Sequence, residues 1–203
     1  MLDAVGEVLA TEPEAVTMPL VAERAGLSVA TAYRYFPSLE ELLTSYAREL
    51  VVELRDYSHD CPKTGAALFE DVVDYWARSL TVHGPAIVQL RSHKGFLRRL
   101  MDNDELIGVV RDAWERPIRG VLRQLQLGDE QFNSALFLHN VLFDPRELFD
   151  LMDSGMEESE AVARLIGAYY GALQGWAEPR LQAVGGKAAR RKAGAISTAA
   201  SNG

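Results

Sequence analysis

Apolar residues recur at helical spacing along almost the whole of this 203-residue chain. At its start, Leu2, Val5, Val8 and Leu9 stand at i, i+3, i+6 and i+7, which places them on one face of a helix. No stretch alternates apolar and polar residues as a half-buried strand does. The sequence therefore predicts an all-α fold.

The breaks between the helical stretches divide the chain into three parts. We expect an N-terminal domain of three short helices over residues 1–45 and a larger helical domain over residues 46–177. Residues 178–203 are small and basic and lack an apolar stripe, so we expect a disordered basic tail. From residue 39 onward, helices are predicted over about 39–58, 64–82, 85–93, 103–126, 130–142, 145–154 and 157–177.

Charge and cysteine content exclude several classes of protein. The net charge is −8, and residues 1–57 carry four arginines against ten acidic residues. This is not the basic footprint that nucleic-acid binders usually show. Cys61 is the only cysteine, which rules out an intramolecular disulfide and a cysteine-rich zinc site. Without a secretory signal or an apolar run of ~20 residues, we expect a cytoplasmic protein with no membrane contact.

Two short helices with strong end signals lie between residues 17 and 37. Thr17 and Ser28 are good N-caps, and Gly26 between them can take the left-handed conformation that ends a helix. Pro37 ends the second helix, because proline disfavours helical geometry in the residue before it. A tight turn between two capped helices predicts a helix-turn-helix.

The second helix carries side chains suited to DNA. In this motif it lies in the major groove. Tyr33 and Tyr35 can donate hydroxyl hydrogen bonds to phosphates, and Arg34 can reach a phosphate or a guanine edge. Thr31 offers a hydroxyl and a methyl group. The same shape also occurs in proteins that never touch DNA, where Tyr33 would simply be packed.

The stretch "TMPLVAERAGLSVATAYRYFPSLEELL", residues 17–43, resembles the N-terminal domain of the TetR family of transcriptional regulators. The resemblance covers about residues 2–50. It implies a homodimeric repressor that binds a palindromic operator in double-stranded DNA and is released by a small-molecule effector bound in the C-terminal domain. The family's DNA contacts map onto Thr17, Ser28, Val29, Ala30, Thr31, Tyr33, Arg34 and Tyr35.

Two departures from the family pattern weaken the expectation of DNA binding. Leu39 stands where the family usually carries a lysine that meets a phosphate. The family also usually has a basic arm ahead of the first helix, so we expect that helix to be incomplete at its N-terminus. The alternative is a helical interaction module that kept the fold but lost sequence-specific DNA binding.

Three glycines, Gly167, Gly171 and Gly175, recur every four residues in the last predicted helix. Each costs about 1 kcal/mol relative to alanine inside a helix, so a smooth face for another helix is the expected compensation. The resemblance implies a four-helix dimer interface, with Tyr170 beside the groove. Packing against a helix of the same subunit is the alternative.

The effector site is harder to locate in the sequence. Pro117 removes a backbone hydrogen bond inside the 103–126 helix, and a kinked helix next to a large aromatic residue is a plausible pocket wall. Both tryptophans in this domain could equally be core residues, and lone histidines usually lie at the surface or in a satisfied core. The candidate pocket residues are Trp76, His83, Trp114, Pro117 and His139.

No motif for catalysis was found. The chain has no Glu-x-x-His pair, no Gly-rich phosphate loop and no Gly-x-Ser-x-Gly. Cys61 near His59 is the only nucleophile-like cluster, and we interpret it as incidental. The sequence predicts neither an enzyme nor a cofactor or metal requirement.

Overall fold

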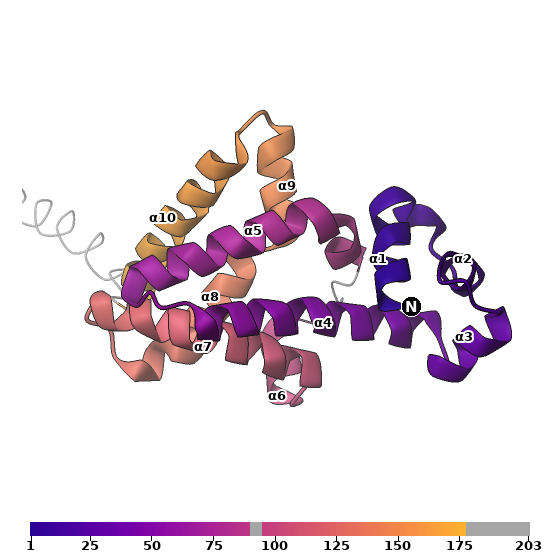
Figure 1. Cartoon of the computed structure of the whole chain (residues 1–203). Coiled ribbons are helices and arrows are strands. Elements are labelled where there is room, and N and C mark those ends of the chain that lie inside the picture. Colours follow the sequence, from indigo (N-terminus) through magenta and orange to yellow (C-terminus); the bar gives the residue numbers. More distant parts are fainter. Residues whose placement is uncertain (90–94, 178–203) are drawn as a thin grey trace, which may run out of the picture.

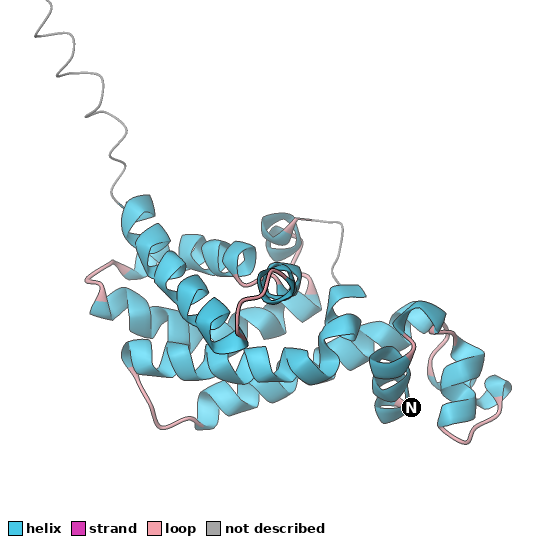
Figure 2. Cartoon of the chain, turned by 90° about the horizontal axis from the view of Figure 1, so that it is seen from above, coloured by secondary structure: helices cyan, strands magenta, loops and turns pink. Residues whose placement is uncertain are grey.

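The computed structural model describes residues 1–89 and 95–177, and every regular element in those ranges is helical (Figures 1 and 2). The predicted all-α fold is confirmed. The predicted tail, residues 178–203, lies outside the described residues. The α-helices in the described ranges are α1 Leu2–Thr11, α2 Met18–Arg24, α3 Val29–Tyr35, α4 Leu39–Asp60, α5 Gly65–Gln89, α6 Phe96–Met101, α7 Glu105–Gln124, α8 Phe132–Leu142, α9 Pro145–Asp153 and α10 Glu158–Ala177.

Helix α4 is shared by two hydrophobic cores. Its first half packs with α1–α3 at one end of the molecule, and its second half packs against α5 and α7 (Figure 1). Leu42 and Tyr46 belong to the N-terminal core, whereas Leu54 belongs to the core formed with the later helices. The boundary predicted at residue 45 therefore falls inside one continuous helix.

The two predicted N-caps form the expected hydrogen bonds. The side-chain oxygens of Thr17 and Ser28 accept backbone N–H groups at 3.4 and 3.1 Å, and that of Ser38 does the same at the start of α4, at 3.1 Å. Gly26 has a φ of +68°, the left-handed value expected where α2 ends. The end signals that predicted two short helices thus act as the sequence suggested.

Two helices differ from the sequence prediction. The break expected between residues 82 and 85 does not exist, because α5 continues to Gln89. Gly84 instead allows a close approach, since a Cβ there would lie 2.2 Å from Cζ of Phe149 on α9. The stretch after residue 95, read as a break, forms α6, which buries Phe96. Tertiary packing overrides the local break signals at both places.

Arg116 on α7 holds the C-terminal end of α4. Its Nη1 donates to the carbonyl oxygens of Ser58 at 2.7 Å and Cys61 at 2.9 Å, and its Nη2 donates to that of Lys63 at 3.0 Å. Carbonyl groups at a helix end have no partner within the helix. One guanidinium therefore satisfies several of them and ties α4 to α7.

Candidate DNA-binding surface and ligand cavity

Helix α3 presents large apolar and aromatic side chains to solvent. Val29, Tyr33 and Tyr35 are 40 %, 48 % and 63 % exposed, whereas Ala32 is fully buried against the N-terminal core. Because Tyr33 is exposed, the alternative in which it is simply packed does not apply. Figure 1 shows α3 at the outer end of the molecule, away from α5–α10.

All eight predicted DNA contacts lie on this end of the chain. Thr31 is half-buried, and its hydroxyl lies 2.9 Å from that of Ser28. The guanidinium of Arg34 lies 5.7 Å from the centre of the Tyr35 ring, a cation–π distance. The exposed members of the set are Thr17, Ser28, Val29, Ala30, Tyr33, Arg34 and Tyr35.

The residue that departs from the family pattern has a structural role. Leu39, at the start of α4, is partly buried and packs against the N-terminal core. Arg24 on α2 is 3.5 Å from the carboxylate of Glu7. On α3 itself, the exposed arginine is Arg34.

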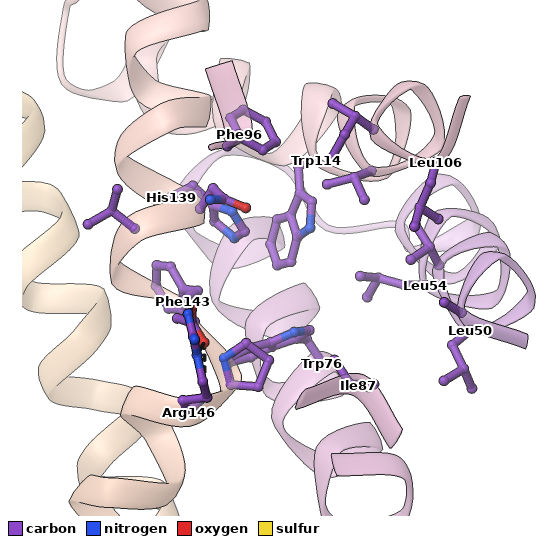
Figure 3. Close-up of a pocket in the computed structure, with 18 of the residues that line it drawn as sticks. Leu50, Leu54, Trp76, Ile87, Phe96, Leu106, Trp114, His139, Phe143 and Arg146 are labelled. Atoms are coloured by element: carbon purple, nitrogen blue, oxygen red, sulfur yellow. Dashed lines mark hydrogen bonds and ion pairs between the residues drawn. The ribbon is translucent and has the colours of Figure 1, made fainter. Parts of the chain in front are cut away.

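A cavity of about 460 Å³ opens among α4–α9 in the larger domain (Figure 3). Leucine and valine side chains of α4 form one wall, including Leu50 and Leu54. Leu106 and Val110 of α7 extend this aliphatic surface. A cavity of this size with mainly apolar walls is typical of a small-molecule site.

Four rings form a continuous aromatic wall in the same cavity. The ring centroids of Trp114 and His139 are 3.9 Å apart, and those of His139 and Phe143 are 4.8 Å apart. Phe143 meets Trp76 edge to face at 5.8 Å. Figure 3 shows Trp76 and Trp114 reaching into the space from α5 and α7.

Three of the five predicted pocket residues line this cavity: Trp76, Trp114 and His139. Pro117 is buried in α7 but does not line it, and His83 lines a separate hollow of about 200 Å³. Phe143 also lines the cavity, although it falls in the break between two predicted helices and the sequence around it carries no pocket signal.

Charged groups of the cavity were also missed. Arg99, Asp144 and Arg146 line it, and each arginine is held by a carboxylate. Arg99 lies in the stretch that the sequence did not assign to a helix. Asp144 is the N-cap of α9, a role that its position before Pro145 could have indicated.

The glycine face of α10 is open. Gly167, Gly171 and Gly175 are exposed, and a Cβ built on any of them would meet no atom within 4 Å. No described part of the same chain fills the groove, so packing against the described residues does not explain these glycines. Tyr170 is half-buried beside them and donates a hydrogen bond to Glu70 at 3.1 Å.

The ionisable clusters in the described ranges do not resemble a metal centre, since no group of three or more potential ligands lies close enough to hold an ion. Among those same residues, no helix is long and apolar enough to cross a bilayer.

Tyr169, the largest fully buried side chain among the described residues, donates a hydrogen bond to the carbonyl oxygen of Ala135 at 3.0 Å. Its raised pKa, caused mainly by burial, fits a core role.

Comparisons with known proteins agree with this architecture. The sequence pattern described as "Bacterial regulatory proteins, tetR family" matches residues 8–46. A TetR transcriptional regulator from Rhodococcus sp. RHA1 has a similar structure, with a TM-score of 0.58 and 18 % sequence identity. The match covers 85 % of this chain and 92 % of that protein. No curated protein sequence matches. Residues 8–46 thus carry the helix-turn-helix pattern of the tetR family, and the chain as a whole has the fold of a TetR transcriptional regulator.

Proposed function

We propose that the protein is a cytoplasmic repressor that binds a palindromic operator as a homodimer and is released by a small molecule. The observation that carries this proposal is the exposed face of α3, where two tyrosines and an arginine stand outside a well-packed helix-turn-helix. Large exposed aromatic residues on one short helix are typical of a surface that binds a partner.

DNA recognition is assigned to α3 and the start of α2. With α3 in the major groove, Tyr33 and Tyr35 donate their hydroxyls to phosphates, and Arg34 reaches a phosphate or a guanine. Thr17 and Ser28 cap helices whose N-terminal N–H groups attract phosphate. Val29, Ala30 and Thr31 complete the surface.

Dimerisation is assigned to α8 and α10. The open groove at Gly167, Gly171 and Gly175 accepts a helix at close range, because glycines let two backbones approach. The ring centroids of Phe137 on α8 and Trp176 on α10 are 6.1 Å apart, so these two aromatic side chains join the helices assigned to the interface. A closed two-fold assembly pairs this face with its own copy.

Effector release is assigned to the cavity of about 460 Å³. Helix α4 contributes Leu50 and Leu54 to the cavity and Leu42 to the N-terminal core. A ligand that shifts α4 therefore changes the position of the DNA-binding helices. Such a ligand alters DNA affinity only by as much as it prefers one position of α4.

DNA binding is tested by fluorescence anisotropy with the DNA that flanks the gene. We expect Arg34→Ala to weaken binding by at least tenfold, and we expect wild-type affinity to fall steeply with added salt because phosphate contacts release counterions. Arg98→Ala is the matched control, since Arg98 is an exposed arginine on α6 that pairs with Asp102 at 3.5 Å.

A protein-interaction module without DNA binding is the second candidate. The acidic balance of residues 1–57 and the packed Leu39 favour it. This candidate predicts no binding to the flanking DNA even at low salt. Equal affinities of wild type and Arg34→Ala would likewise contradict the assigned contact.

A further inference from the structure

The two arginines in the described lining of the cavity are each paired with a carboxylate. Arg99 donates from Nε to Oδ2 of Asp104 at 2.9 Å and from Nη2 to Oδ1 at 3.1 Å. Arg146 donates from Nε to Oδ1 of Asp144 at 3.0 Å and from Nη2 to Oδ2 at 2.7 Å. The Nε/Nη2 edge of each guanidinium is therefore occupied by a carboxylate in the strong bidentate geometry.

Both pairs are charged and mutually neutral at physiological pH. The hydrogen bonds that Arg99 donates lower the pKa of the Asp104 carboxyl, and those that Arg146 donates to Asp144 raise the pKa of the Arg146 guanidinium. The side chains of Arg99 and Asp144 are only 17 % and 10 % exposed. An anionic ligand therefore meets arginines whose charge a carboxylate already balances, which reduces the usual electrostatic gain from such a contact.

The remaining lining favours an apolar ligand with rings. The wall of Trp76, Phe143, His139 and Trp114 offers stacking and edge-to-face contacts, each of which adds to simple burial. Glu147, also a lining residue, is exposed to solvent, so its charge is screened by water.

We infer that the effector is a neutral, largely apolar compound with at least one aromatic ring. This inference rests on the proposed function of the cavity and specifies the class of its ligand. Among the described residues, the cavity disfavours anions because carboxylates neutralise its two arginines, and it favours flat rings because one of its walls is aromatic.

Three naphthalenes of similar shape separate charge from size. The reporter is N-phenyl-1-naphthylamine, a neutral dye that fluoresces in apolar sites. The competitors are 1-methylnaphthalene, 1-naphthoate and 1-naphthylmethylammonium. We expect the neutral compound to displace the dye at a concentration at least tenfold lower than either ion. Equal or better displacement by either ion would overturn the inference, as would the absence of dye binding.

Mutation of the acidic partner gives a causal test. Asp104→Asn removes the charge that neutralises Arg99 but keeps an oxygen that can cap α7, where Asp104 accepts the N–H of Ile107 at 3.2 Å. We expect 1-naphthoate to bind at least fivefold more tightly to this variant and 1-methylnaphthalene to bind unchanged. Asp102→Asn, next to α6, should alter neither affinity. An unchanged naphthoate affinity in Asp104→Asn would show that internal neutralisation does not set the selectivity.

The location and the aromatic preference have their own controls. Val51→Trp fills the cavity and should abolish dye binding, whereas Val52→Trp, on the same helix but outside the lining, should not. Saturation of the rings, from methylnaphthalene to methyldecalin, should weaken displacement at least threefold. Dye binding that survives Val51→Trp or a stronger methyldecalin would contradict the inference. DNA affinity is measured separately with and without 1-methylnaphthalene, so a ligand that binds without changing DNA affinity counts against the proposed function alone.

Discussion

The hydroxyl of Tyr46 lies 2.7 Å from Nδ1 of His83, and this hydrogen bond joins α4 to α5 where the two cores meet. Tyr46 is buried in the N-terminal core, whereas His83 belongs to a helix of the larger domain. The Tyr46 ring also covers Gly6 of α1, where a Cβ would lie 2.7 Å from the hydroxyl oxygen. One side chain therefore connects α1, α4 and α5.

Removal of this hydroxyl should loosen the docking of α1. In Tyr46→Phe the ring still fills its site but the hydrogen bond to His83 is lost, a cost of about 1 kcal/mol. We expect faster amide hydrogen exchange in residues 2–11. Tyr57→Phe is the matched control, since Tyr57 donates at 2.7 Å to Asp71 at the other end of the larger domain. Equal exchange of α1 in both variants would mean that the Tyr46 contact does not hold it.

An alanine at position 6 should act through the same hydroxyl. Gly6→Ala improves helix propensity by about 1 kcal/mol but forces Tyr46 to move, and we expect a net loss of stability. The loss should be smaller in the Tyr46→Phe background, because the closest atom is gone. A double-mutant cycle from urea unfolding measures this coupling. If the two substitutions had additive effects on the unfolding free energy, the contact between the new methyl group and the Tyr46 hydroxyl would not be what destabilises Gly6→Ala.

A long charged side chain on the glycine face should prevent dimerisation. Gly171→Arg places a guanidinium in the groove, and we expect the dimer dissociation constant, measured by sedimentation velocity, to rise at least tenfold. Gly108→Arg is the control, because Gly108 is also an exposed helical glycine with no atom near a Cβ. A dimer that tolerates Gly171→Arg uses another face.

The carboxylate of Asp71 should make stability depend on pH. Lys63, Tyr57 and Cys61 donate hydrogen bonds to it, and these contacts lower its pKa below the usual 3.8. The bond to Asp71 also raises the pKa of Tyr57 to about 12. Because the folded state holds the charged carboxylate, this stability is complete above the unfolded pKa and is lost as pH falls through the folded one.

Comparison with Asp71→Asn isolates that contribution. We expect the variant to lose about 1–2 kcal/mol of unfolding free energy at pH 7, measured by urea denaturation. The difference from wild type should shrink progressively below about pH 4, where the wild-type carboxyl becomes protonated. A difference that is constant with pH would mean that the ionised form gains nothing from its partners.

Local signals predicted the N-terminal domain well. Thr17, Gly26 and Ser28 determine their turns within a few residues, so the helix-turn-helix could be derived without knowledge of the rest of the chain. The cavity could be predicted only in part. Trp76 and Trp114 are conspicuous by size, but Phe143 becomes a wall only through packing of helices distant in sequence.

A glycine that indicates a helix end in the sequence can instead allow a close contact inside a helix. Gly84 is such a case, because it lies within α5 and accommodates Phe149. His83 was assigned to the ligand pocket for its chemistry alone, and it instead contacts Tyr46. Periodicity gives the buried face of a helix but not the neighbour that packs on it.

Arg116 holds the C-terminal end of α4 in place, so a tilt of this helix pivots about that end. At 1.5 Å per residue, Leu54 lies about 9 Å from the last residue of α4 and Leu39 about 31 Å from it. A rigid tilt about this end moves Leu39 roughly three times as far as Leu54. In the proposed mechanism, a ligand that displaces Leu54 would therefore move the DNA-binding helices by a larger distance than it moves the cavity wall.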